Sequence, residues 1–246
     1  MSTTPVALVT GGAKRVGRTI VQRLAQAGYD VAFTYYSSKM EADQLVEETM
    51  RLHGRKAIAI QADLTEPEIW VEPIRMAITR EFERLDVLVN NASLYQAANL
   101  QQTDISLMRK LDAIHVQSPL LLCKAFESLL QSSHGHVVNM ADLLAEKPSP
   151  KYLAYCASKA ALANLTLGLA RELAPEVTVN GIAPGVVEWP DDLPEAERQK
   201  YLSRVPLGRP GTPADVAELV HFLCTGGSYI TGQIIRLDGG RSISVS

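Results

Sequence analysis

Three side chains near the middle of the chain have the types and spacing needed for proton transfer. Tyr155 and Lys159 stand four residues apart in an apolar, alanine-rich stretch, and Asp142 precedes them. Residues at i and i+4 share a helix face, so the Lys159 ammonium is expected beside the Tyr155 phenol, where it favours the ionised form. An isolated tyrosine has a pKa of about 10, too high for proton transfer at neutral pH. A nearby cation lowers this pKa and so makes the phenol a usable acid-base group. A half-buried tyrosine beside a solvated lysine is the alternative.

The N-terminal segment has the pattern of a phosphate-binding turn. Residues 6–9 form a short apolar run typical of a buried strand, residues 10–17 are rich in glycine, and an amphipathic helix follows as far as Gly28. In a dinucleotide fold this order brings bare backbone and a helix N-terminus to a pyrophosphate. Glycines also occupy strand-to-helix corners for steric reasons alone, so the turn by itself leaves both interpretations open.

Composition indicates one enzyme-sized domain. A chain of 246 residues buries roughly 75% of the surface that its unfolded form exposes, so it can form a stable core without disulfide bonds. The net charge of -3 argues against a nucleic-acid partner. Cys123, Cys156 and Cys224 are far apart in apolar contexts, which indicates reduced core thiols and neither disulfides nor a metal site. The chain shows no secretion signal and no apolar run of membrane-spanning length, so we expect a cytoplasmic protein with no membrane partner.

Strand-like and helix-like segments alternate along the whole chain. The helical pattern covers about 38–53, a segment after Pro67, a long stretch at 104–130, the segment from Tyr155 to Leu173 and a segment from about Pro213. The strand-like runs are residues 6–9, 31–34, 57–60, 87–89, 137–138, 177–179 and 234–235. This alternation predicts an α/β fold, a doubly wound parallel seven-stranded sheet of Rossmann type, as a single domain over 1–246. Residues 185–212, rich in Pro, Gly and acids, are predicted to be a substrate-binding loop.

Five motifs on this pattern resemble the short-chain dehydrogenase/reductase family over essentially the whole chain. They are Thr10-Gly11, Asn90-Asn91-Ala92, Tyr155-x-x-x-Lys159, Pro184-Gly185 and Asp238-Gly239-Gly240. The resemblance implies that Tyr155 is the catalytic acid-base and that Lys159 lowers its pKa and holds the nicotinamide ribose. It also implies that Asn91 supports the cofactor and that Asp63 lies against the adenine, although Asp63 is equally suited to cap the helix that follows.

The expected cofactor is NADPH. An acid at the end of the second strand would hold the ribose of NAD, and none precedes Glu41 here. Hydroxyl groups and the cations Lys14, Arg15 or Lys39 would instead meet a 2′-phosphate. The residues expected at the cofactor are Gly11, Lys14, Arg15, Val16, Tyr36, Ser37, Ser38, Asp63, Leu64, Asn91, Ala92, Ser93, Tyr155, Lys159, Pro184 and Gly185.

Two departures from the family pattern are informative. Most members have a third glycine where this chain has Arg15 and a serine where it has Asp142, and both exchanges resemble the pteridine reductase subgroup. Reduction of a pterin C=N bond must place a proton on a ring nitrogen, which a carboxylic acid can supply. We therefore expect Asp142, Tyr155 and Lys159 to be the catalytic residues, with Asp142 as proton donor. A solvated helix-start arginine and an aspartate that caps a loop are the alternatives.

The resemblance extends to the substrate side. Ser93 would touch cofactor and pterin, and Tyr95 would stack on the ring, unless it is a surface tyrosine. Tyr152 would form the pocket wall or a hydrogen bond to the pterin. Trp189 would close over the ligand or anchor a neighbouring subunit. The expected substrate-binding residues are Ser93, Tyr95, Asp142, Tyr152, Tyr155 and Trp189. His115 stands where most relatives place an asparagine of the proton relay, and a relay role and a packed core histidine both remain open.

The leading hypothesis is an NADPH-dependent pteridine reductase that acts on a dihydrobiopterin, dihydromonapterin or dihydrofolate type of substrate. A carbonyl reductase of a 3-oxoacyl or similar ketone is the second hypothesis, although serine at 142 would suit it better. A dinucleotide-sensing module without turnover is the third, and the intact Tyr155–Lys159 pair argues against it. Family resemblance also implies a homotetramer.

Overall fold

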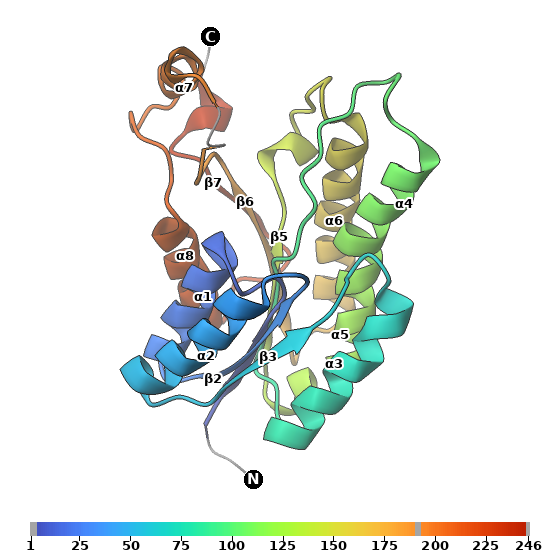
Figure 1. The fold of residues 1–246 in the computed structure, drawn as a ribbon, viewed down its shortest axis with the longest axis vertical. Helices are drawn as coiled ribbons and strands as arrows, with labels where there is room; N and C mark the ends of the chain where they lie inside the picture. Colours follow the sequence, from blue (N-terminus) through green and yellow to red (C-terminus); the bar gives the residue numbers. More distant parts are fainter. Residues whose placement is uncertain (1–3, 190–192, 245–246) are drawn as a thin grey trace.

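The computed structural model describes residues 4–189 and 193–244 (Figure 1). Its centre is one sheet of seven parallel strands in the order β3-β2-β1-β4-β5-β6-β7. The strands are β1 (Val6–Val9), β2 (Asp30–Tyr35), β3 (Ala57–Gln61), β4 (Val87–Asn90), β5 (His136–Met140), β6 (Thr178–Pro184) and β7 (Ile234–Leu237). The predicted fold class is therefore confirmed.

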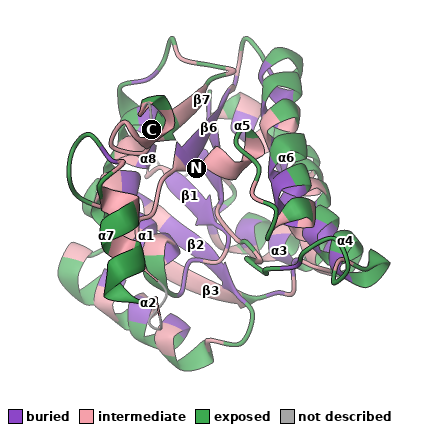
Figure 2. Ribbon diagram, turned by 90° about the horizontal axis from the view of Figure 1, so that it is seen from above, coloured by how far each residue is buried: buried purple, intermediate pink, exposed green. Residues whose placement is uncertain are grey.

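Helices cover both faces of the sheet, which is why the central strands read as unbroken apolar runs. One face carries α1 (Arg15–Gln26), α2 (Lys39–His53) and α8 (Pro213–Thr225) (Figure 1). The other face carries α3 (Pro67–Phe82), α4 (Ile105–Asp112), α5 (Ser118–Ser132) and α6 (Leu153–Glu172). Each face has its own apolar core, and the central strands between them are buried, whereas the edge strands β3 and β7 are partly exposed (Figure 2).

The strand order reverses direction at β1, because β2 and β3 lie on one side of it and β4 to β7 on the other. The loops that follow β1 and β4 therefore diverge at the carboxyl edge of the sheet. In open α/β sheets this switch point is where ligands bind. Among the residues expected to form the site, the turn after β1 and the loops after β4 and β5 carry Gly11, Lys14, Asn91, Ala92, Ser93, Tyr95, Asp142 and Tyr152.

The helix expected at 104–130 is present as one continuous helical stretch over residues 105–132, although its winding is not regular. The structure has α4, then a π-helical segment (Ala113–Gln117), then α5, which extends to Ser132. Pro119 lacks the N–H that a regular helix would offer to the His115 carbonyl, which weakens regular α-helical winding here. π-helical turns of this kind occur frequently at functional sites, and this one contains His115. The irregular stretch 185–212 likewise contains a helix, α7 (Glu195–Leu202).

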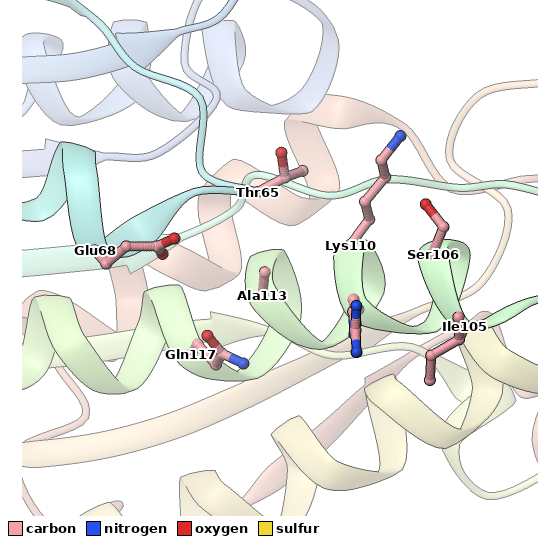
Figure 3. A pocket seen from close by; sticks show the side chains of 8 residues that line it. Thr65, Glu68, Ile105, Ser106, Lys110, Ala113 and Gln117 are labelled. Atoms are coloured by element: carbon pink, nitrogen blue, oxygen red, sulfur yellow. The ribbon is translucent and has the colours of Figure 1, made fainter.

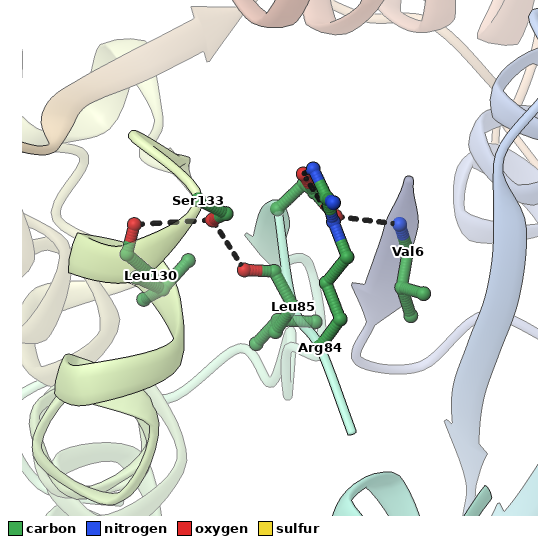
Figure 4. A network of polar contacts seen from close by, with 6 residues as sticks. Val6, Arg84, Leu85, Leu130 and Ser133 are labelled. Carbon is green, nitrogen blue, oxygen red and sulfur yellow. Dashed lines mark hydrogen bonds and ion pairs between the residues drawn. The ribbon is translucent and has the colours of Figure 1, made fainter. Parts of the chain in front are cut away.

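A polar network joins the amino ends of the central strands (Figure 4). Asp86 accepts a hydrogen bond from the Val6 N–H at 2.8 Å and forms a two-pronged ion pair with Arg84. Ser133 donates to the Leu85 carbonyl at 2.7 Å on the neighbouring segment. The network fixes the edge of the sheet opposite the candidate site.

We predict that Asp86→Ala lowers the free energy of unfolding by about 1–3 kcal/mol, because the buried Val6 N–H and the Arg84 guanidinium both lose a charged partner. Urea unfolding followed by circular dichroism measures the loss. Glu72→Ala is the matched control, since the Glu72–Arg75 pair is exposed and should contribute little. Equal stability of the two variants would contradict the assignment.

Candidate active site

Asp142 and Tyr155 come together at the carboxyl edge of the sheet. Asp142 follows β5 by two residues, and Tyr155 lies in the first turn of α6. The Tyr155 hydroxyl donates a hydrogen bond to Asp142 Oδ2 at 2.7 Å, and the Leu144 N–H donates to Oδ1 at 2.8 Å. Asp142 therefore caps the loop, which was the alternative interpretation, and is also the hydrogen-bond partner of Tyr155. Its role as proton donor stays a prediction.

Lys159 is buried below this pair. Its Nζ donates to the Met140 carbonyl at 2.7 Å and lies 5.8 Å from the centroid of the Tyr155 ring. Burial lowers the pKa of Lys159 to about 8, and the Asp142 carboxylate opposes this shift. Only 2% of the Lys159 surface is exposed. Because its pKa is lowered to about 8, the side chain gains or loses its charge close to physiological pH.

The expectation that Lys159 holds the Tyr155 phenol ionised is wrong for this structure. Burial raises the pKa of Tyr155, and the negative charge of Asp142 raises it further. The phenol is therefore protonated and donates to the carboxylate. This 2.7 Å hydrogen bond joins Asp142 and Tyr155 into one unit that holds a proton.

His115 connects α6 to the loop after β4. Its Nδ1 lies 2.8 Å from Ser158 Oγ, and its Nε2 lies 2.8 Å from Ser93 Oγ. The side chain is 1% exposed, and burial followed by the Lys159 charge lowers its pKa to about 2. Sequence reasoning left His115 outside the expected site, and the one available signal was its place in the asparagine position of the family.

The substrate-side tyrosines form an aromatic cluster. The rings of Tyr95 and Tyr152 stack with centroids 4.6 Å apart, and Tyr95 meets the Tyr155 ring edge-on at 4.9 Å. Tyr95 remains 56% exposed, so it covers Tyr155 from the solvent side. Trp189 packs instead against Tyr201 of α7, with ring centroids 5.3 Å apart.

The turn after β1 presents bare backbone. Gly11 has a φ of +64°, and a Cβ at Gly17 would lie 2.1 Å from the Gly11 carbonyl oxygen, so only glycine fits there. Asn91 Nδ2 donates to the Thr10 and Gly11 carbonyls at 2.9 and 3.1 Å. This clamp holds the turn against the loop after β4. The crowded glycines and the start of α1 suit a pyrophosphate.

A cavity of about 120 Å³ adjoins this turn at the end of β2. It is lined by Gly11, Ala13, Lys14, Tyr35, Tyr36, Ser37 and Ser38. The lining contains hydroxyl groups and a cation and no carboxylate, which fits a ribose 2′-phosphate better than a free 2′-hydroxyl. Lys14 forms an ion pair with Glu41 at 2.7 Å. Lys14 would have to leave this ion pair in order to bind a phosphate.

Arg15 adopts a conformation that normally belongs to glycine. Its φ is +53°, in the left-handed region, and this explains why related chains have glycine at this position. The guanidinium forms an ion pair with Glu188. Contact between Arg15 and a cofactor phosphate stays a prediction. Val16 follows it in the first turn of α1 and packs against the core.

The remaining cofactor-side residues lie along the same edge. Asp63 accepts from the Thr65 N–H at 2.9 Å, and Glu66 is the N-cap of α3, so the alternative that Asp63 caps this helix is not the one found. Its place at the adenine stays a prediction. Leu64 beside it is buried. Pro184 ends β6, and the Gly185 N–H donates to the Leu237 carbonyl at 2.9 Å. Ala92 lies in the loop after β4, where its N–H donates to Thr10 Oγ1 at 2.9 Å.

A larger cavity of about 450 Å³ lies between the start of α3 and α4 (Figure 3). Its lining residues are Thr65, Glu68, Ile105, Ser106, Arg109, Lys110, Ala113 and Gln117. None of these belongs to the Asp142–Tyr155 pair, so the cavity is separate from the candidate site. Within residues 4–189 and 193–244, no group of three or more His, Cys, Asp or Glu side chains could hold a metal ion.

One helix in the described part of the chain, α6, is long and apolar enough to cross a membrane. Half of it is buried inside the protein, and it carries Tyr155 and Lys159. It is therefore accounted for as a core helix. The three cysteines are free and buried, as expected.

The fold and the Tyr155–Lys159 helix beside a glycine-rich turn define a Rossmann-type oxidoreductase. A family model described as enoyl-(acyl carrier protein) reductase matches residues 11–242, and with it the chain belongs to the short-chain dehydrogenase/reductase family. The predicted family membership is confirmed.

Named relatives differ in what they act on. The 3-oxoacyl-[acyl-carrier-protein] reductase FabG of Staphylococcus aureus is 34% identical, covering 98% of this chain and 99% of its own. Pteridine reductase 1 of Leishmania tarentolae is 33% identical, covering 98% of both. A blue fluorescent protein from a metagenomic library, solved in complex with NADPH, has a TM-score of 0.88 at 34% identity and covers 97% of this chain and 98% of its own.

The lowered pKa of Lys159 predicts a pH-dependent stability difference. Between about pH 8 and the ordinary lysine pKa of about 10.4, the unfolded state binds more protons at this site than the folded state. Wild type should therefore gain stability relative to Lys159→Met as pH rises through this window. Urea unfolding at pH values on both sides of 8 measures the difference.

Lys110→Met, at an exposed lysine of α4, is the control and should show a flat difference. A flat difference for Lys159→Met as well would contradict the burial of a charged lysine at this site.

Proposed function

We propose that the protein is an NADPH-dependent pteridine reductase that converts a dihydropterin of the biopterin, monapterin or folate type to its tetrahydro form. The observation that carries the proposal is the 2.7 Å hydrogen bond from Tyr155 to the Asp142 carboxylate. A carboxyl group in place of a neutral hydroxyl suits protonation of a ring nitrogen. The 33% identity to a pteridine reductase supports the proposal.

In this reaction the bound cofactor supplies a hydride to a ring carbon. The residues of this chain supply the proton: it passes from the Asp142–Tyr155 unit to the adjacent ring nitrogen, and the C=N bond becomes C–N. Solvent then returns a proton to the unit. Lys159 holds positive charge beneath the phenol, which favours proton release from it.

NADPH as the cofactor is supported by the carboxylate-free cavity at the end of β2 and by the NADPH complex of the similar solved structure. Lys14, Ser37 and Ser38 would hold the 2′-phosphate. Gly11 and the start of α1 would hold the pyrophosphate, and Lys159 the nicotinamide ribose.

Reduction of a 3-oxoacyl ketone is the second candidate function. The 34% identity to FabG favours it, and a protonated Tyr155 can donate to a ketone oxygen. We further propose a homotetramer, supported by exposed apolar side chains on α5 and α6 such as Leu120 and Leu167, and a cytoplasmic location.

Turnover with NADPH over a panel of substrates tests the proposal. We expect oxidation of NADPH, followed by absorbance, with 7,8-dihydrobiopterin, dihydromonapterin or dihydrofolate and little with acetoacetyl thioesters or acetoin. The opposite pattern would replace the first candidate by the second. Binding of NADPH without turnover of either class would favour the dinucleotide-sensing module.

Asp142→Asn should lower kcat for the dihydropterin by about 10²- to 10⁴-fold, since an amide cannot take up the Tyr155 proton and pass it on to the ring nitrogen. NADPH affinity, measured by fluorescence titration, should stay close to that of wild type. Glu146→Gln is the matched control, because Glu146 is a nearby carboxylate that pairs with Arg236 at the surface. Unchanged turnover in Asp142→Asn would remove this residue from the mechanism.

Ser37→Asp should reverse cofactor preference. A carboxylate at the end of β2 repels a 2′-phosphate and accepts from a 2′-hydroxyl, so the ratio of kcat/KM for NADPH to that for NADH should fall at least about tenfold. Ser37→Asn, of similar size without the charge, should change the ratio much less. A ratio that stays constant in Ser37→Asp would place the 2′-phosphate elsewhere.

A further inference from the structure

A chain of hydrogen bonds runs from α6 through His115 to Ser93, and its direction can be deduced. Ser158 Oγ lies 2.8 Å from the Tyr155 carbonyl oxygen, which can only accept. The single hydroxyl proton of Ser158 is therefore used in this bond. Because Ser158 Oγ also lies 2.8 Å from His115 Nδ1, it must accept there, and Nδ1 carries a proton.

The other side of the ring leads independently to the same tautomer. The Leu94 N–H can only donate, and it points at His115 Nε2 at 3.3 Å, so Nε2 carries a lone pair. Burial and the nearby Lys159 charge lower the pKa of His115 to about 2, which keeps the ring neutral. The Tyr155 ring packs edge-on against the imidazole at 5.5 Å and adds no charge in its protonated form.

Ser93 must therefore donate its proton to His115. The Ser93 Oγ lies 2.8 Å from His115 Nε2. If the Ser93 O–H pointed away from His115, a lone pair of the oxygen would face the lone pair of Nε2 across this short distance. Donation of the same proton to the Tyr155 phenol, which would lower the phenol pKa, is excluded on this ground. Ser93 is exposed and borders the Asp142–Tyr155 pair. Because its proton is held by His115, the Ser93 oxygen offers only lone pairs to a ligand.

We propose that His115 is a positioning residue that fixes the polarity of Ser93, so that Ser93 accepts a hydrogen bond from an N–H group of the substrate. This inference rests on the proposed function and deepens it. An amino-substituted heterocycle, such as a 2-aminopteridine, offers such a donor, whereas a simple ketone offers only acceptors. His115 thereby makes the site selective for donor-bearing rings.

The chemistry explains what histidine provides that an asparagine would not. An asparagine amide carries both a donor and an acceptor and can rotate to offer either to Ser93. A neutral imidazole whose Nδ1–H is held by Ser158 offers one lone pair and no alternative. His115→Asn is thus the informative conservative variant.

Nitrogen NMR of protein labelled with ¹⁵N-histidine tests the polarity directly. We expect the His115 ring to be neutral with its proton on Nδ1 from about pH 6 to about pH 8, where free histidine titrates. Loss of the signal in His115→Asn assigns it. A proton on Nε2, or a charged ring within this range, would overturn the proposal.

Dissociation constants measured by calorimetry in the presence of NADPH test the selectivity. Wild type should bind a 2-amino-4-oxodihydropteridine about tenfold more tightly than the 2,4-dioxo analogue, a difference typical of one hydrogen bond. Ser93→Ala and His115→Asn should both reduce this ratio towards one, with unfolding curves confirming that each variant folds. Ser106→Ala, at an exposed serine of α4, should retain the wild-type ratio.

A ratio that is unchanged in both variants, or near one in wild type, would overturn the proposal. These two experiments measure ligand affinity and the position of the His115 proton, so they test the proposal even when neither pteridine is reduced. Absence of reduction would count against the proposed function alone.

Discussion

The hydrogen bonds between Thr10 and Asn91 are the constraint on which the site depends. Thr10 Oγ1 accepts from the Asn91 and Ala92 N–H groups, each at 2.9 Å, while Asn91 Nδ2 holds the carbonyls of Thr10 and Gly11. These bonds tie the turn after β1 to the loop after β4 at the point where the strand order reverses. The cofactor side and the Ser93–Tyr95 side are therefore positioned relative to each other by the same few bonds.

Charge is the second constraint. Lys159 and His115 are both buried next to the Asp142–Tyr155 pair, and burial lowers the pKa of each base. Lys159 still titrates near neutrality because Asp142 opposes the effect, whereas His115 stays neutral. Lys159 can thus supply a positive charge to the site, whereas the neutral His115 ring can only donate and accept hydrogen bonds.

The two named relatives, a 3-oxoacyl reductase and a pteridine reductase, match the chain to nearly equal extents. Overall similarity therefore does not separate ketone from pterin chemistry. Under the proposed function the distinction rests on few atoms: the carboxylate at 142 in place of a hydroxyl, and the proposed polarity of Ser93.

Much of this protein followed from its sequence. Alternating apolar runs and helical periods predicted the seven parallel strands, because strands buried on both faces must be apolar throughout. The glycine-rich turn, Tyr155 and Lys159 predicted the oxidoreductase family, since their order along the chain is itself specific. The long helix at 104–130 is present, but the π-helical turn inside it was not predicted, and Glu66 and not Asp63 precedes α3. Both features depend on local winding that composition does not encode.

Only the tertiary structure decided the state of the reacting groups. Sequence spacing placed Lys159 beside Tyr155 and so suggested an ionised phenol, but burial and the Asp142 carboxylate raise the phenol pKa instead. Spacing likewise could not show that Arg15 pairs with Glu188 or that His115 joins Ser158 to Ser93. Protonation and hydrogen-bond direction depend on distances between residues far apart in the chain, and folding alone sets those distances.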